Sequence, residues 1–458
     1  MTDTALKPAS AAAARTKLLL DGPMVPTLLR IAAPNLVVNV VLISITTSVD
    51  AHFVGRLGLD GLAGLALVFP LMMLMQQMAN MAMGGAIAAS IARALGAGRR
   101  EDAASLAIHA IVIAVAAGAL FSAVFLLGGR ALYELLGGRS AVLAAALEYS
   151  NVIFAGAAVY WLLGALTSIV RGTGQAAILV YVYLGAEILH VALVPLLVFG
   201  WGPVPPLGIT GAGLATLISL IVNCAALTAT IATGRTALAP ALMSWRLERR
   251  LFGEILGVGV PMSLMPVLNN AALATLTAYA SLLGATSLAT FGAAVRLEYL
   301  LYPLAFGFGA AMLAMVGTNI GARQFARARR IAWTAIGLSA CVMATVGAVA
   351  IVSPDTWMTF FSRDPAILAE AAPYLAIVGF AYPFVACNSL MSAFQATRQP
   401  QWPLLSMACR LVVVVIGGWI AIEVLHMGLA GLGLATALGL ATCGVVHSAA
   451  FRFYANLR

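Results

Sequence analysis

The sequence contains few charged residues: Asp, Glu, Lys and Arg make up 9% of 458 residues, whereas 62% are hydrophobic. Soluble domains contain about 25% charged residues, so this composition excludes an ordinary soluble protein and predicts one that is embedded in a membrane. The net charge of +9 comes from basic residues at the ends of apolar segments. This distribution is typical of membrane orientation rather than of nucleic-acid binding, and we expect no nucleic-acid partner.

Cysteine pairs and catalytic motifs are also missing. Each of the five cysteines lies singly in an apolar stretch, which excludes a disulfide framework and a CxxC metal pair. There is no GxSxG, HExxH or Walker motif, and the five histidines have no metal-ligand spacing. We therefore expect a protein that is not an enzyme and that has no cofactor. The apolar run 18–20 is too short for a signal peptide, so the segment 1–26 is predicted to stay attached in the cytoplasm.

Long apolar runs fill the rest of the chain. A bilayer core of roughly 30 Å takes about 20 residues per helix. The sequence therefore predicts an all-α integral membrane protein with twelve transmembrane helices. Bounded by Gly, Pro or charged residues, the runs lie near 30–52, 61–92, 104–127, 141–166, 176–199, 211–232, 253–283, 287–317, 330–352, 367–392, 402–424 and 429–452.

The basic residues are unevenly distributed between the two sides of these runs. With a cytoplasmic N-terminus, 20 of the 25 Lys and Arg residues fall on the cytoplasmic side, and Arg410 is counted among them. Arg296 lies inside a run, and the outer side holds Arg56, Arg130, Arg139 and Arg363. The positive-inside rule then predicts that both termini are cytoplasmic.

Two blocks of the sequence recur in the second half of the chain. LGAGR at 95–99 resembles IGAR at 320–323, and GITGAGLAT at 208–216 resembles GLAGLGLAT at 428–436. The repeat predicts two parallel six-helix lobes. We expect a cytoplasmic segment at 1–26, an N-lobe at 27–232, a cytoplasmic linker at 233–251 and a C-lobe at 252–458.

The run 30–52 carries polar residues on one helical face: Asn35, Asn39, Thr46 and Asp50. A charge inside a bilayer is costly, so Asp50 is a candidate for function by default. Its position towards the outer end of the run leaves two interpretations open. Asp50 either binds a coupling cation or is an interfacial carboxylate that pairs with Arg56 or His52.

The run 176–199 places Tyr183, Glu187 and His190 on one face. Glu187 lies about 17 Å from the cytoplasmic end, near the middle of the membrane. An imidazole beside a carboxylate can share its proton, so the pair is a candidate proton relay. A buried structural hydrogen bond is the alternative.

Other polar residues lie in four more runs. Arg296 and Glu298 are two residues apart and point to different faces, so each needs a partner on another helix, as a static pair or as a moving part. The Met-rich run 61–92 either lines an adaptable pocket for apolar cations or packs in the ordinary way. With Arg296 and Glu298, the candidate substrate cavity comprises Asn35, Asn39, Thr46, Gln76, Asn80, Tyr183, Asn269, Asn270 and Asn388.

Several motifs resemble the multidrug and toxic compound extrusion (MATE) family of secondary transporters over residues 18 to 455. VDAHFVGRLG at 49–58 is close to the family's VDTxFVGxLG. Further matches are DGP at 21–23, PTLLR at 26–30 with Pro34-Asn35, LGAG at 95–98, RGTGQ at 171–175, PLLVFG at 195–200 and Arg296-Leu297-Glu298.

The resemblance implies a cation-coupled efflux cycle in which Asp50 binds the coupling H+ or Na+. The family's NxxxDP motif in the fifth helix reads HVALVP at 190–195 here, so Val194 replaces its carboxylate. Glu187, one turn earlier, is our candidate for that missing group, with His190 beside it. A Glu found in the seventh helix of some members is matched by Asn269 or Asn270, and the tenth helix carries Asn388.

The sequence thus predicts a multi-pass transporter of the bacterial inner membrane. We expect it to exchange H+ or Na+ for amphipathic, often cationic, solutes by alternating access and to act as a monomer. No metal is expected apart from Na+ near Asp50. A lipid-linked sugar flippase of the same superfamily is the first alternative, and an integral membrane enzyme is the alternative of another class.

Overall fold

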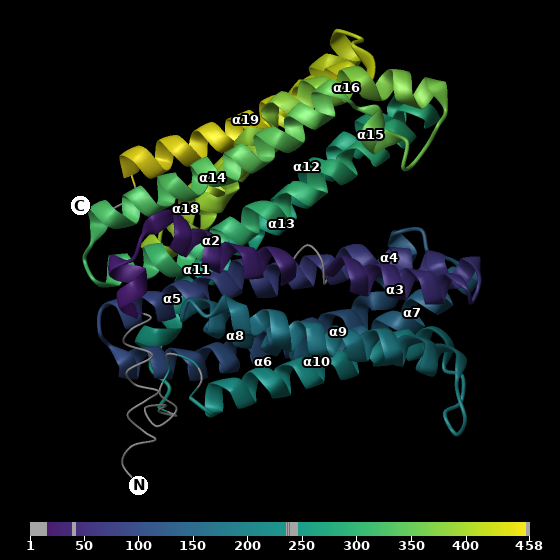
Figure 1. Cartoon of the computed structure of the whole chain (residues 1–458). Coiled ribbons are helices and arrows are strands. Elements are labelled where there is room, and N and C mark those ends of the chain that lie inside the picture. The colour runs from purple at the N-terminus through teal and green to yellow at the C-terminus, as the bar shows by residue number, and fades with distance from the viewer. Residues whose placement is uncertain (1–15, 39–42, 235, 237, 239–245, 455–458) are drawn as a thin grey trace. The chain divides into compact units, whose positions relative to one another are not determined.

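The regular structure of this chain is helical. The computed structural model describes residues 16–38, 43–234, 236, 238 and 246–454. Within these ranges the elements are helices, apart from one isolated bridge between Trp201 and Val204 (Figure 1). The all-α prediction is confirmed.

The chain forms two compact units. The first unit comprises Met1–Asp21 and Val37–Gly259, and the second comprises Gly22–Leu36 and Val260–Arg458. These divisions differ from the predicted lobe boundaries in two places. Residues 22–36 group with the second unit, and residues 252–259 group with the first.

In the first unit, the described residues form a short helical stretch at 16–21 and then a series of further helices. In chain order these are α3 (Ile43–Gly55), α4 (Leu59–Gln77), the π-helical η2 (Met78–Met83), α5 (Gly84–Gly96), α6 (Arg100–Leu135), α7 (Ser140–Ala155), α8 (Ala157–Gly172), α9 (Ala176–Phe199) and α10 (Gly208–Ala232). The helix α11 (Arg249–Met262) crosses the division between the units.

The second unit begins with an early segment of the chain, α2 (Met24–Leu36), which packs against α13 (Ala285–Gly321) (Figure 1). Gly307 of α13 meets Leu36, and the Arg327 side chain donates a hydrogen bond to the Gly22 carbonyl. The other elements are α12 (Leu264–Leu282), α13 (Ala285–Gly321), α14 (Phe325–Val352), α15 (Asp355–Met358), α16 (Pro365–Val385), the 3-10 helix η4 (Ala386–Ser389), α17 (Leu390–Thr397), α18 (Gln401–Trp419), the π-helical η5 (Ile420–Val424) and α19 (Gly428–Tyr454).

Each predicted apolar run falls on a helix or on a set of consecutive helices. Among the described residues, ten helical segments are long and apolar enough to cross a membrane, and a bent pair, α7 with α8 at 49°, makes eleven. The run 30–52 contains residues 39–42, which lie outside the described residues. The sequence did not predict the breaks inside several runs, such as the one between α11 and α12.

The internal repeat is visible in the packing of glycines. A Cβ atom added to Gly213 of α10 would lie 3.6 Å from the Tyr149 ring, and one added to Gly433 of α19 would lie 3.1 Å from the Tyr374 ring. Both tyrosines are fully buried. Small residues at these matched positions therefore let a helix approach a buried ring in each unit.

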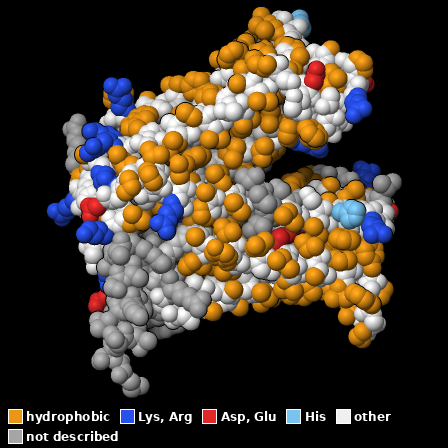
Figure 2. Space-filling model, in the orientation of Figure 1, with side chains coloured by type: hydrophobic (Ala, Val, Ile, Leu, Met, Phe, Trp, Pro, Cys, Tyr) orange, Lys and Arg blue, Asp and Glu red, His pale blue; other side chains and the backbone are white. Residues whose placement is uncertain are grey.

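The surface has the character expected of a membrane protein. Hydrophobic side chains are spread over the face shown in Figure 2. Exposed large apolar residues occur on long helices of both units, for example Leu127 and Val352. Such surfaces suit lipid rather than water. The cytoplasmic placement of both termini stays a prediction.

Candidate functional site

Asp50 is the centre of a buried polar cluster in the first unit. It lies on α3, and its side chain and that of His190 on α9 are 8% and 2% exposed. His190 Nε2 lies 3.0 Å from Asp50 Oδ1. The Thr216 hydroxyl of α10 donates a longer contact of 3.5 Å to Asp50 Oδ2. Three helices thus enclose a carboxylate whose nearest basic neighbour is an imidazole.

Glu187 lies one turn before His190 on α9. Its Oε2 accepts a 2.6 Å hydrogen bond from the Thr46 hydroxyl of α3, one turn from Asp50. Glu187 Oε1 is buried, with no hydrogen-bond partner among the described residues. The shared face of α9 therefore presents two titratable side chains to α3. Tyr183 instead meets the Thr167 hydroxyl of α8 at 2.9 Å.

Asp50 does not pair with Arg56 or His52, the partners that the interfacial alternative predicted. Arg56 lies over the Phe199 ring, 5.4 Å from its centroid. His52 is exposed and packs edge to face against Phe53. Asp50 pairs with His190 instead.

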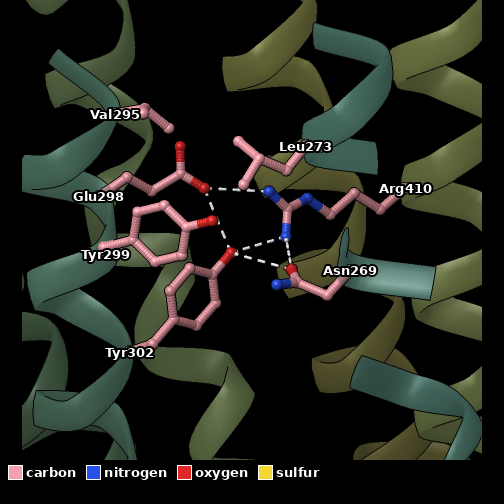
Figure 3. A pocket seen from close by; sticks show the side chains of 7 residues that line it. All are labelled: Asn269, Leu273, Val295, Glu298, Tyr299, Tyr302 and Arg410. Carbon is pink, nitrogen blue, oxygen red and sulfur yellow. Dashed lines mark hydrogen bonds and ion pairs between the residues drawn. The ribbon is translucent and has the colours of Figure 1, made fainter. Parts of the chain in front are cut away.

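A second buried cluster surrounds Glu298 in the second unit (Figure 3). Arg410 of α18 donates from Nη2 to Glu298 Oε1 at 3.0 Å. Its Nη1 donates to Asn269 Oδ1 at 2.7 Å and to the Tyr302 hydroxyl at 2.6 Å. The Tyr302 hydroxyl also contacts Glu298 Oε1 at 3.2 Å. With Leu273, Val295 and Tyr299, these residues line a small pocket between α12, α13 and α18.

The assignment of Arg410 to the cytoplasmic side was wrong. Arg410 lies within α18 and is 3% exposed. The count of basic residues treated it as an orientation signal, although its run, 402–424, is apolar on both sides of it. A charge inside such a run usually has a partner and a function, and that rule identifies Arg410 from the sequence. The partner expected for Glu298 on another helix is thus found.

Arg296 does not share this cluster. Its guanidinium lies over the Phe361 ring, 5.1 Å from the centroid, and the residue is exposed. The two-residue spacing predicted that Arg296 and Glu298 point to different faces, and the structure confirms it.

The remaining predicted residues make mostly local contacts. Asn35 donates to the Ile31 carbonyl at 2.9 Å and lies in the second unit, whereas Thr46 and Asp50 lie in the first. Asn80 donates to the backbone of Gln76. In the second unit, Asn270 donates to the Pro266 carbonyl, and Asn388 accepts from Cys443 Sγ at 3.6 Å. Asn39 lies outside the described residues.

Sequence reasoning missed Thr216, Tyr302 and Arg410. Thr216 belongs to the repeated block 208–216, whose recurrence predicts the two lobes but no polar role for its threonine. In the part of the chain that the structure describes, no three His, Cys, Asp or Glu side chains are grouped as a metal site requires. The first cluster pairs a carboxylate with an imidazole, which can gain or lose a proton, and the second pairs a carboxylate with a guanidinium, which stays charged.

Comparison with known proteins gives consistent matches over most of the chain. The family model described as MatE matches residues 36–196 and 261–420. The "FAD transporter" of Shewanella oneidensis is 25% identical over 399 residues, covering 87% of this chain and 88% of the relative. The "Probable multidrug resistance protein NorM" of Deinococcus radiodurans is 28% identical over 438 residues, covering 91% and 93%. The solved structure of a MOP superfamily transporter from Pyrococcus furiosus has a TM-score of 0.85 at 22% identity, covering 95% of this chain and 97% of that one.

Proposed function

The chain belongs to the MatE family of membrane transporters, and we propose that it exports amphipathic solutes in exchange for protons bound at Asp50. The resemblance seen in the sequence motifs is confirmed, and the protein is a multi-pass membrane transporter rather than an enzyme. The direction of transport, the coupling ion and a bacterial inner-membrane location are parts of the proposal. So is action as a monomer.

The buried pair of Asp50 and His190 carries the proposal. One proton on the pair gives a state of zero net charge, either as a carboxylate with an imidazolium or as a carboxylic acid with an imidazole. Loss of that proton leaves a buried negative charge, which the membrane interior disfavours. The pair therefore holds a proton until the site opens to water or a solute replaces it.

Glu187 supplies a second proton position on the same helix face. Its bonded oxygen is held by Thr46, and its other oxygen is free of a protein partner among the described residues. We propose that Glu187 passes protons to and from His190, taking the place of the second carboxylate that Val194 replaces. A carboxylate and an imidazole one turn apart are suited to such transfer.

The donor set favours H+ over Na+. Hard cations require several oxygen ligands, as Ca2+ and Mg2+ sites illustrate. The Asp50 carboxylate faces an imidazole nitrogen at 3.0 Å and one hydroxyl at 3.5 Å. The nearest group thus competes for the carboxylate rather than adding an oxygen ligand.

Exchange follows if protonation and solute binding favour different arrangements of the transporter. A ligand shifts such an equilibrium only by its difference in affinity for the two states. Protonation of Asp50 discharges the site and stabilises one arrangement, and the solute stabilises the other, so each promotes release of its competitor. The cationic character of the solutes remains a prediction from the family resemblance.

Reconstituted transport tests the proposal. Purified protein in proteoliposomes is given either a pH gradient or a Na+ gradient, and flux is measured for ethidium, other cationic dyes and FAD. We expect a pH gradient to drive flux in the wild type and to drive none in Asp50→Asn. Asp60→Asn is the matched control, because it makes the same change at an exposed acid nearby. Drive by Na+ alone, or normal pH-driven flux in Asp50→Asn, would overturn the coupling assignment.

A further inference from the structure

The cluster around Arg410 has an unusual balance of charge for a buried site. Arg410 and Glu298 have side chains that are 4% and 6% exposed, and both lie within helices that are long and apolar enough to span a membrane. Arginine keeps its positive charge in proteins. A negative charge must therefore stay beside Arg410, whereas the identity of the group that carries it can change.

Arg410 and Glu298 share fewer hydrogen bonds than the two that a fully formed ion pair of these groups has. Guanidinium and carboxylate groups pair most strongly through two parallel hydrogen bonds. Among the described residues, the hydrogen bonds of Glu298 all use Oε1, and Arg410 Nε has no partner. Nη1 is satisfied by the neutral oxygens of Asn269 and Tyr302. One single bond thus connects the two charges.

The surroundings of this bond suit a ligand with an aromatic or apolar body. The pocket is lined by the rings of Tyr299 and Tyr302 and by Leu273 and Val295 (Figure 3). Tyr299 is 45% exposed, so the pocket opens beside an aromatic ring. The pocket has a volume of about 10 Å³, which is room for roughly one water-sized group, so a ligand would place only its small anionic group beside Arg410 and lay the rest against Tyr299.

We propose that Arg410 binds the oxyanion of a solute, a carboxylate or phosphate on an aromatic or apolar body, while Glu298 takes up a proton. Before binding, the charges of Arg410 and Glu298 cancel. Afterwards the oxyanion of a monoanionic solute accepts from Arg410 Nη2, the proton resides on a Glu298 oxygen, and the charges again cancel. The inference rests on the proposed transport function and specifies a class of substrate for it, an anionic one in place of the cationic solutes that the family resemblance predicts.

Glu298 carries the carboxyl group of this cluster. The other titratable groups that face it or Arg410 are hydroxyls and a thiol: Tyr299 and Tyr302 of α13, Tyr374 and Tyr382 of α16, and Cys443 of α19. Such groups are ordinarily neutral at pH 7. Binding of an oxyanion is therefore expected to strengthen as the pH falls, with uptake of one proton.

Calorimetry on purified protein in detergent tests this site without any transport step. The probes share a ring and differ in charge: 2-naphthoate, 2-naphthyl phosphate and the neutral 2-naphthamide. At about pH 6 we expect the wild type to prefer one anion over the amide by at least about tenfold, and to lose much of this preference at about pH 8. The two anion arms distinguish a carboxylate from a phosphate substrate, and the comparison between pH values uses 2-naphthoate, because a phosphate monoester itself gains a charge above about pH 6.

Two variants separate a binding site from a structural pair. Arg410→Gln should lose the preference for anions and keep the weak binding of the neutral amide. The amide signal also measures how much of each probe partitions into the detergent micelle. Glu298→Gln should bind the anion at both pH values as tightly as the wild type does at about pH 6. The tighter anion binding of Glu298→Gln at about pH 8 tests the site even if Arg410→Gln fails to fold.

Two results would overturn the inference: equal binding of all three probes by the wild type, or no gain in anion affinity for Glu298→Gln at about pH 8. The anion preference of the wild type is measured in detergent, with no pH gradient and with Asp50 unchanged. A failure of proton-driven transport is therefore distinguishable from a failure of the anion site.

Discussion

The two units of this transporter each bury a carboxylate beside a basic group, but the basic groups differ. In the first unit Asp50 faces His190, which can be neutral or charged, whereas in the second Glu298 faces Arg410, which is always charged. The first cluster can therefore change its net charge by binding or losing a proton. The second needs a counter-anion at all times.

The internal repeat does not explain why the two units carry different charged clusters. Gly58 and Gly284 both precede a helix in a backbone conformation with positive φ, 127° and 108°, so they are matched positions of the two halves. Counting back from them places Asp50 opposite Leu276, which is buried in the second unit's core. The second unit thus has an apolar residue at the matched position and builds its charged cluster from other residues. Duplicated scaffolds therefore constrain helix packing more strongly than they constrain the site.

The largest effect we expect comes from breaking the permanent charge balance of the second unit. Glu298→Leu leaves Arg410 buried without a counter-charge, which should cost about 3–5 kcal/mol of stability. Glu298→Leu with Arg410→Leu removes both charges and should recover most of that loss. Thermal unfolding of purified protein in detergent measures both. A double variant as unstable as the single one would mean that the cluster matters through its packing rather than through its charge.

A change at His190 tests whether the first unit depends on titration. The amide in His190→Gln still donates a hydrogen bond to Asp50 but cannot take up a proton. We expect pH-driven flux to fall by about tenfold, corresponding to about 1.4 kcal/mol, with little change in stability. His52→Gln, at an exposed histidine of the same unit, is the control and should transport normally. Undiminished flux in His190→Gln would assign the imidazole a structural role.

The helices and the first cluster were largely predictable from the sequence. Apolar periodicity gave the runs, and the spacing of Glu187 and His190 placed both on one face, because helix geometry is local. The family resemblance grouped Glu187 and His190 with Asp50, but helix spacing could not show that His190 makes the direct contact, since it joins residues 140 positions apart. Only part of the second cluster was predicted. Glu298 was a candidate, but its partner Arg410 was counted with the cytoplasmic basic residues.

The bond between Thr46 and Glu187 offers a smaller effect that sharpens the role of the first unit. Thr46→Val removes the hydroxyl that donates to Glu187, and we expect a loss of about 1 kcal/mol of stability.

Glu187→Gln should flatten or shift the pH profile of flux, because an amide cannot relay a proton. Flux across a series of pH values measures this effect, and an unchanged profile would remove Glu187 from the relay.

The smallest effect is expected where charges meet in water. Arg130 and Glu134 of α6 lie 2.9 Å apart with side chains 75% and 50% exposed. Solvent weakens their attraction, and both long side chains lose freedom on pairing, so Glu134→Gln should change stability by less than about 0.5 kcal/mol. The same change of Glu to Gln at Glu298 removes a buried charge. Comparing the melting temperatures of Glu134→Gln and Glu298→Gln at low and high salt therefore shows whether burial causes the difference in stability. If Glu134→Gln destabilised the protein as much as Glu298→Gln, burial would not explain why the second unit needs a permanent counter-charge.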